Sequence, residues 1–186
     1  MLRSGARKAV LFLLAIGCAG TSSRRSDAGA VGQPAPLGVK PGSPATSLFD
    51  RDWVWEDDLG SSVRFSAWRG KLLVVGLVYT SCTTVCPLSI EKMRQLSAAF
   101  EREGRAAEFV LVTLDPMSDT VAQLVRFKEA RNLPRRWHLV RGSQQQTDAL
   151  ADALRFKTVT MGDHVVHEAK IVLVDERGRV MGYLHG

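Results

Sequence analysis

An apolar run without polar alternation occupies residues 72–79, "LLVVGLVY". Such a run is typical of a central β-strand that is covered on both faces. After Pro87 the apolar residues recur with a helical period, at Leu88, Ile90, Met93, Leu96 and Phe100. Because proline is tolerated only in the first turn of a helix, we expect a helix to start at Pro87, with Thr83 or Thr84 as its cap.

The rest of the pattern alternates strands with helices. Predicted strands cover residues 63–68, 109–114 and 137–140, predicted helices cover residues 120–130 and 143–154, and a hairpin is predicted over residues 171–174 and 180–184. This order indicates the α/β class, with a central mixed sheet and flanking helices in three layers. It resembles the thioredoxin fold, which normally closes with a helix after the hairpin. Because the sequence ends at Gly186, we expect that C-terminal helix to be missing.

Residues 1–17 have the pattern of an export signal. Basic residues precede an apolar run over 9–16 that is too short to span a bilayer, and "GCAG" follows. Residues 15–18 resemble a bacterial lipobox, which implies lipidation of Cys18; an ordinary secretory signal is the alternative. Residues 18–46 are rich in Ser, Gly, Ala and Pro and predict a flexible linker, so residues 47–186 form the predicted domain.

The formal charge of +6 is concentrated in this leader. Residues 1–45 hold six basic residues and one acidic residue, which accounts for +5 of the total. The domain itself is almost neutral. A broad phosphate-binding face is therefore not expected, and nucleic acid is excluded as a partner.

Two of the three cysteines, Cys82 and Cys86, stand where the apolar run ends and the helix begins. Residues four apart share one helix face, and a helix start favours an anion, so we expect a lowered thiol pKa. Three interpretations follow. A structural disulfide would close a very small loop and gain little stability. Redox exchange usually has two intervening residues rather than three. A soft metal such as Cu(I) suits two thiolates and a third ligand.

Histidine is the natural third ligand, and the chain has four. His138 lies within a predicted strand and His185 lies beside the C-terminus. We therefore expect His138 to be a core or edge residue and His185 to be exposed. His164 and His167 are placed in the loop before the hairpin, which in a thioredoxin-like fold returns over the start of the cysteine-bearing helix. Geometry alone leaves either of them open.

Four motifs occur in order: "GK" at 70–71, "VYTSCTTVCP" at 78–87, "LDPMSDT" at 114–120 and "HEAKIVLVDERGRV" at 167–180. Together they resemble the Sco/SenC family of copper-binding, thioredoxin-like assembly factors for cytochrome c oxidase. The resemblance implies copper, as Cu(I) or also Cu(II), on Cys82, Cys86 and His167. His167 is preferred because the family's histidine stands a few residues before the hairpin pattern.

The resemblance also implies partners and a location. We expect a copper metallochaperone, not an enzyme, that serves the copper A site of cytochrome c oxidase subunit II or a similar acceptor. An upstream periplasmic copper chaperone is a second expected partner. The protein should be exported to the periplasmic side of a bacterial membrane and held there by a lipid anchor.

The residues also bear on two competing functions. A thiol–disulfide oxidoreductase acting on the cysteines of an exported acceptor remains the alternative, although the chain has no proline after Pro134 to stand opposite the cysteines. A peroxiredoxin motif needs a proline just before its cysteine, and residues 78–81 contain none.

In the third motif, we interpret Asp115 with Pro116 as a turn and Asp119 as the cap of the next helix. The four tryptophans are interpreted as packing residues.

Overall fold

The computed structural model describes residues 40–41, 47–83, 85–156, 158–161, 164–167 and 169–185, and at residues 40–41, 158–161 and 164–167 it describes the backbone alone. The predicted export signal, Cys18, most of the predicted linker and the possible cap Thr84 lie outside these residues.

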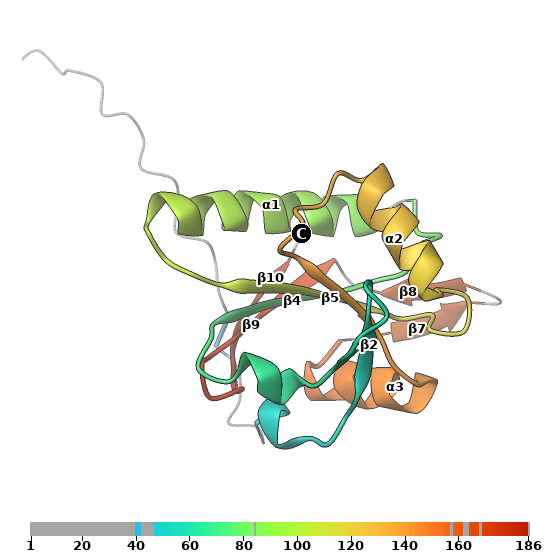
Figure 1. Ribbon diagram of the computed structural model, residues 1–186, viewed down its shortest axis with the longest axis horizontal. Helices are drawn as coiled ribbons and strands as arrows, with labels where there is room; N and C mark the ends of the chain where they lie inside the picture. The colour runs from blue at the N-terminus through green and yellow to red at the C-terminus, as the bar shows by residue number, and fades with distance from the viewer. Residues whose placement is uncertain are drawn as a thin grey trace, which may run out of the picture. The chain divides into compact units, whose positions relative to one another are not determined.

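Ten strands occur in the described residues. They are β1 (Lys40–Pro41), β2 (Trp55–Asp57), β3 (Ser62–Val63), β4 (Leu73–Val78), β5 (Glu108–Thr113), β6 (His138–Arg141), β7 (Thr158–Met161), β8 (His164–His167), β9 (Lys170–Val174) and β10 (Val180–His185). Eight form one sheet in the order β1-β10-β9-β4-β5-β6-β2-β3 (Figure 1). The three strands β4, β5 and β6 are parallel, while β9 runs antiparallel to β4 and β2 antiparallel to β6. The sheet is therefore mixed, as expected.

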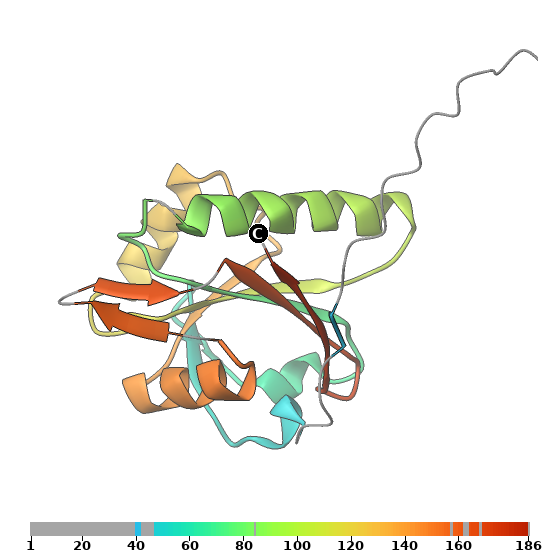
Figure 2. The same ribbon diagram turned by 180° about the vertical axis from the view of Figure 1, so that it is seen from behind.

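Helices cover both faces of this sheet (Figures 1 and 2). The α-helices are α1 (Val85–Arg102), α2 (Val121–Ala130) and α3 (Gln144–Ala153), and the short 3-10 helices are η1 (Leu48–Asp50) and η2 (Phe65–Trp68). Buried side chains of α1 and α2 share one apolar cluster, and those of α3 and η2 belong to the other. The predicted three layers are confirmed.

The central strand β4 shows why the sequence gives two cores. All six of its residues are buried. Leu73, Val75 and Leu77 join the cluster on the α3 side, whereas Val74 and Val78 join the cluster under α1. Because successive strand residues point to opposite faces, a strand with helices on both sides must be apolar at every position. The unbroken run in the sequence reflects this burial.

Gly76 lets α1 lie close to the sheet. A Cβ atom at this position would stand 2.9 Å from Met93 Sδ and 3.1 Å from a methyl carbon of Leu111. Met93 of α1 therefore occupies the space that a side chain at Gly76 would need. The same helix carries Cys86 in its first turn. The helix starts at Val85, two residues before the expected position, so Pro87 still lies in the first turn, where its missing N–H costs nothing.

The hairpin predicted at the end of the chain is confirmed by β9 and β10. Its turn is closed by Asp175, whose Oδ1 accepts hydrogen bonds from the backbone amides of Arg177 (2.9 Å) and Arg179 (2.8 Å). Burial alone would raise the pKa of Asp175, but these bonds and the Arg179 guanidinium outweigh it and lower that pKa. Gly178 has a φ of +80°, the left-handed region that glycine adopts without strain.

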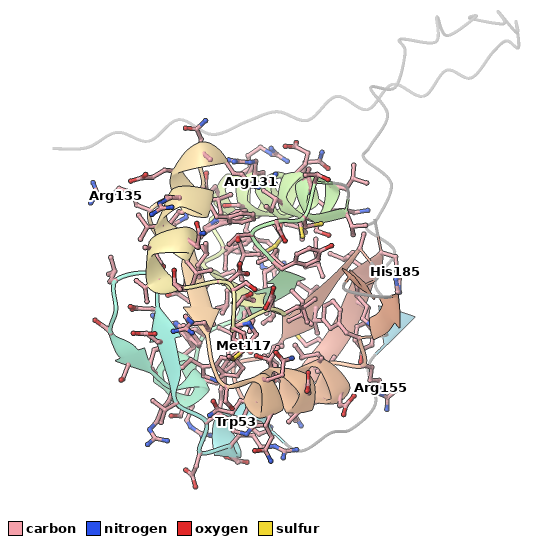
Figure 3. The ribbon with its side chains drawn as sticks, turned by 90° about the vertical axis from the view of Figure 1, so that its right-hand side faces the viewer. Trp53, Met117, Arg131, Arg135, Arg155 and His185 are labelled. Atoms are coloured by element: carbon pink, nitrogen blue, oxygen red, sulfur yellow. The ribbon has the colours of Figure 1, made fainter. Side chains whose placement is uncertain are left out.

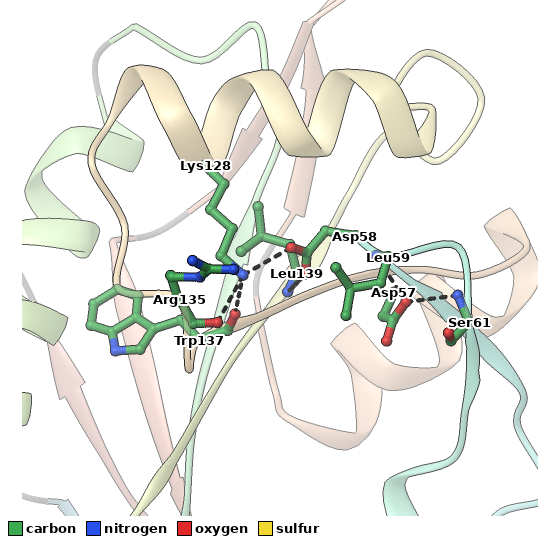
Figure 4. Close-up of polar contacts among 8 residues, drawn as sticks. All are labelled: Asp57, Asp58, Leu59, Ser61, Lys128, Arg135, Trp137 and Leu139. Atoms are coloured by element: carbon green, nitrogen blue, oxygen red, sulfur yellow. Dashed lines mark hydrogen bonds and ion pairs between the residues drawn. The ribbon is translucent and has the colours of Figure 1, made fainter.

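A buried ion pair joins α2 to the chain between β2 and β3 (Figure 4). Lys128 Nζ donates to Asp58 Oδ2 at 2.8 Å and to the backbone oxygen of Trp137 at 2.7 Å. The second carboxylate oxygen, Oδ1, accepts from the Leu139 amide at 3.1 Å. The side chain of Asp58 is 8% exposed and that of Lys128 16%. Every charge in this cluster has a partner, which fits a structural role.

The strand expected over residues 63–68 is wrong beyond Val63. The chain instead forms η2, which buries both Phe65 and Trp68. These two residues are three apart, so a strand would send them to opposite faces, whereas one 3-10 turn places them on the same side. Trp55, Trp68 and Trp137 are all buried in the core, as expected for packing residues.

The loop expected to carry His164 and His167 is also wrong. Both residues lie in β8, which pairs with β7 in an antiparallel ribbon separate from the main sheet. The segment 158–161, "TVTM", is rich in β-branched residues, and "GD" stands between it and "HVVH". These are features of a hairpin rather than of an irregular loop.

Candidate metal centre at the start of α1

The two cysteines lie side by side in a buried position. Cys82 is in the turn after β4 and Cys86 is in the first turn of α1. The Cys86 backbone amide donates to Cys82 Sγ at 3.3 Å. Cys82 is 3% exposed, Cys86 is fully buried, and the two cysteines do not form a disulfide. The turn therefore presents two unbridged sulfur atoms against the start of one helix.

Tyr79 lies against this pair from the end of β4. Its backbone oxygen accepts a bond from Cys86 Sγ at 3.9 Å. Burial, a hydrogen bond with Cys82 and the charges of the two sulfur atoms raise the pKa of the Tyr79 hydroxyl to about 12. The hydroxyl therefore stays protonated beside the thiols at neutral pH.

The lowered thiol pKa expected from the helix start is wrong for Cys86. Burial raises the pKa of the Cys86 thiol well above its ordinary value, and a hydrogen bond with Cys82 raises it further. The positive charge of Arg131 acts in the opposite direction but is outweighed. Removing water from a thiolate costs more here than the helix terminus and the guanidinium return, so without a metal ion Cys86 is a thiol.

Asp119 fixes the start of the turn over residues 79–82, which is called the cysteine turn below. Its carboxylate accepts from the Thr80 amide at 3.0 Å and from the hydroxyl groups of Thr80 and Thr113. Only 2% of Asp119 is exposed. The expected helix-capping role of Asp119 is wrong, because Thr120 caps α2 by accepting from the Gln123 amide at 3.3 Å. Asp119 instead ties the turn after β4 to the end of β5.

The turn at Asp115 is confirmed, since Asp115 Oδ1 accepts from the Ser118 amide at 3.2 Å.

Arg131, at the other end of α2, fixes the cysteine turn a second time. Its guanidinium donates to the backbone oxygen of Cys82 at 2.9 Å and lies over the Phe127 ring, 4.7 Å from the centroid. Arg94 of α1 in turn donates to the backbone oxygens of Arg131 and Asn132. Figure 3 labels Arg131 where the end of α2 approaches α1. Sequence analysis missed Arg131, because nothing in "EARN" marks a contact made 49 positions away.

Two of the four histidines are placed away from the cysteines or exposed, as expected. His138 starts β6, its Nε2 lies 3.1 Å from Glu108 Oε2, and the parallel strands put it at the opposite end of the sheet from Cys82. His185 is exposed at the end of β10, where its backbone oxygen accepts from Lys92 Nζ at 2.8 Å.

His167 pairs through its backbone with Thr158, and His164 pairs with Met161. The ribbon β7–β8 lies at the same end of the domain as the start of α1 (Figures 1 and 2). Side chains of β8 are outside the description, so the ligand role of His167 stays a prediction. Among the side chains that are described, no group of three or more His, Cys, Asp or Glu could hold a metal ion.

Comparison with solved structures shows proteins that have a similar fold. Arabidopsis thaliana ScoI with copper bound matches with a TM-score of 0.64 at 20% identity, over 72% of this chain and 85% of that chain. A SCO1/SenC family lipoprotein from Bacillus anthracis gives 0.66 at 23% identity, over 72% and 82%. BsSco, described as a Sco family cytochrome c oxidase assembly protein with a disulfide switch, gives 0.66 at 22%, over 78% and 85%. These likenesses confirm the thioredoxin-like fold.

Within the described residues, no helix is both long enough and apolar enough to cross a bilayer.

At the level of sequence, a family model described as SCO1/SenC matches residues 42–186. This range includes Cys82, Cys86, all four histidines and the whole sheet apart from Lys40 and Pro41. The match covers well over half of the chain and agrees with the structural likeness. The protein therefore belongs to the SCO1/SenC family.

Proposed function

We propose that this protein binds copper through Cys82, Cys86 and His167 and delivers it to the copper A site of cytochrome c oxidase, on subunit II or a similar acceptor. The observation that carries this proposal is the pair of buried thiols, not joined by a disulfide, held side by side at the start of α1. The family membership supports it, as do the copper-bound Arabidopsis ScoI and the oxidase-assembly role given for BsSco.

The donor set suits copper chemically. Thiolate sulfur and imidazole nitrogen are ligands that copper prefers, and a set of two sulfurs and one nitrogen can enclose Cu(I) in a trigonal arrangement. Because Cys86 is a thiol in the absence of metal, copper binding must displace its proton. The raised pKa therefore makes copper uptake weaker at low pH, and it protects the unloaded thiol from oxidants that attack thiolates.

The third ligand is proposed from strand β8. Positions 164 and 167 are three apart in one strand, and successive strand positions alternate between two faces. The two histidines therefore occupy opposite faces of the ribbon, so at most one of them can serve the cysteine pair. The family resemblance favours His167, and His164 becomes its natural control.

Copper would leave by ligand exchange. An incoming ligand of the acceptor bonds to copper as one of the three ligands of this chain dissociates, and the displaced thiolate regains a proton. No electron moves in this transfer, so the protein is a carrier rather than an enzyme. A periplasmic copper chaperone upstream would load the site by the same exchange in reverse.

We further propose that the protein is exported and held by lipid on Cys18 at the periplasmic side of the membrane. The signal pattern of residues 1–17 and the lipobox-like segment support this, as does the lipoprotein relative in Bacillus anthracis. The predicted linker would let the domain reach its acceptor at the membrane surface.

The test is a Cu(I) titration of the reduced chain beside its Cys82→Ser, His167→Ala and His164→Ala variants. We expect one copper per parent chain, loss of tight binding in Cys82→Ser, a large loss in His167→Ala and little change in His164→Ala. Copper should also raise the unfolding temperature of the parent, since a ligand of the native state stabilises it. A parent without copper-dependent stabilisation would contradict the proposal.

A second candidate function rests on the same two thiols. They lie side by side without a disulfide, and BsSco is described as having a disulfide switch. In this function the pair gives two electrons and two protons to a disulfide of an acceptor, which becomes two thiols while Cys82 and Cys86 form a disulfide. The chemistry needs no histidine. A His167→Ala variant that keeps its activity on the acceptor while it loses copper would favour this candidate.

A further inference from the structure

A groove of about 410 Å³ lies beside the cysteine turn. One wall is the turn itself, at Thr80, and the other is the exposed side of α2. Its lining residues are Thr80, Gln123, Arg126, Phe127, Ala130 and Arg131. Arg131 also donates to the Cys82 backbone oxygen, so the same residue lines the groove and contacts the cysteine turn.

The charge of this groove is uncompensated. Among the residues that the structure describes, neither Arg126 nor Arg131 forms an ion pair with a carboxylate. Other cations of the domain do, for example Lys128 with Asp58 and Arg141 with Glu56. The groove lining contains two arginines and no acidic residue.

Two charged residues near the groove, Arg94 and Asp119, bear on this imbalance. Arg94 of α1 donates to backbone oxygens at the end of α2 and so adds a third cation beside Arg131. Asp119, which bonds to Thr80, is buried and accepts three hydrogen bonds from Thr80 and Thr113. It is not one of the residues that line the groove.

We propose that this groove docks an acidic segment of the protein that exchanges copper with Cys82 and Cys86. The inference rests on the proposed function for the identity of the partner. Guanidinium groups bind carboxylates through paired hydrogen bonds, and two arginines side by side suit two carboxylates of one extended segment. Phe127 and Ala130 supply an apolar floor between them. Opposite charges would also speed the encounter and set its orientation.

Docking here would place the partner at the thiols. The guanidinium that binds a partner carboxylate is the one that fixes the Cys82 backbone. An acidic segment that binds Arg131 in the groove would therefore lie one residue away from the proposed copper ligand Cys82. This location gives the arginines a role in choosing the acceptor, separate from the binding of copper itself.

The probe is a fluorescein-labelled octapeptide of alternating glutamate and serine, compared with a matched peptide in which glutamine replaces glutamate. Binding to the full reduced chain is followed by anisotropy at low and high ionic strength. We expect the acidic peptide alone to bind and to bind more weakly at high salt. Arg126→Gln should weaken it about threefold to fivefold, in line with the loss of one exposed charged contact.

Arg102→Gln is the matched control. It removes the same charge from an exposed arginine at the far end of α1 and should change the affinity by less than about twofold. Equal binding of the two peptides, binding that salt does not affect, or Arg126→Gln binding as tightly as the parent would each overturn the inference. So would binding of anionic phospholipid vesicles, with dependence on Arg126, in place of the acidic peptide.

A copper titration of the parent chain in the same buffer separates the two proposals. If the acidic peptide binds through Arg126 and copper does not bind, the acidic docking groove stands and the copper function fails. If copper binds and the acidic peptide does not, the copper function stands and the groove inference fails.

Discussion

Two buried aspartates fix the chain at different ends of the sheet, and they do so with opposite kinds of partner. Asp58, near the amino end of β6, pairs with the cation of Lys128 and with the Leu139 amide. Among the described residues, Asp119, beyond the carboxyl end of β5, accepts from the neutral donors of Thr80 and Thr113. The first cluster contains its own cation. The second contains none, and the described residues show no ion pair for Arg126 or Arg131, which line the groove beside Thr80.

This difference indicates that stability and exchange chemistry depend on different parts of the fold. A compensated ion pair contributes to the fold but offers no free charge to a partner. At the cysteine turn, Asp119 is held by neutral donors, and among the described residues Arg126 and Arg131 form no ion pair with a carboxylate. We therefore expect damage at Asp58 to appear in the free energy of unfolding, and damage at Asp119 to appear also at the thiols.

The largest expected effect is on Asp58. Asp58→Ala leaves the Lys128 ammonium buried without its carboxylate and should lower the free energy of unfolding by about 3 kcal/mol or more. Denaturant unfolding measures this loss. Copper affinity of the folded variant should stay unchanged, because Asp58 does not touch the cysteine turn. Copper binding that falls together with stability would show that the two clusters are not independent.

Asp119→Ala should have a smaller effect on unfolding and a larger one on the site. It leaves two hydroxyl groups and one amide without their acceptor, which should cost about 2 kcal/mol. The cysteine turn loses its tie to β5, so alkylation of Cys86 in the reduced protein should become faster and copper binding weaker. Asp119→Asn retains one acceptor oxygen and serves as the intermediate control. Unchanged alkylation in Asp119→Ala would contradict the positioning role.

Alkaline pH should weaken the fold through Cys86 and Tyr79. The folded-state pKa values of Cys86 and of Tyr79, the latter about 12, are raised above their ordinary values. As the pH rises above about 9, the unfolded chain loses these protons while the folded chain keeps them, so stability falls with rising pH. Tyr79→Phe should reduce the slope above about pH 10, where the unfolded tyrosine ionises. An identical slope in this variant would exclude Tyr79 as a source.

The smallest expected effect on stability comes from Arg131→Met, which keeps much of the packing over Phe127 but removes the bond to the Cys82 oxygen. Loss of this single bond should cost about 1 kcal/mol. Arg131→Lys should restore part of it. Faster alkylation of Cys86 in Arg131→Met than in Arg131→Lys would support the second fixation of the turn, and equal rates would argue against it.

The same contrast explains what the sequence could reveal. The apolar run over 72–79 predicted the central strand because burial on both faces leaves no polar position, and Pro87 limited where α1 could begin. These are local signals. The contacts of Asp119 with Thr80 and of Arg131 with Cys82 join residues 39 and 49 positions apart, so no local pattern could predict them.

Two errors at the sequence level have local causes. Phe65 and Trp68 resemble strand residues in composition, but their spacing of three suits a 3-10 turn with both rings in the core. The pKa expected at the helix start neglected burial, which at Cys86 outweighs the helix terminus. The ligand role of His167 came from the family resemblance and remains a prediction.

X-ray absorption at the copper edge of the loaded, reduced chain tests the proposed copper ligands directly. We predict two sulfur scatterers and one nitrogen scatterer in the parent and in His164→Ala, with the nitrogen lost in His167→Ala. Two sulfur scatterers with an unchanged nitrogen in His167→Ala would show that His167 is not the third ligand. A copper site without two sulfur scatterers in the parent would contradict the proposal that Cys82 and Cys86 bind copper.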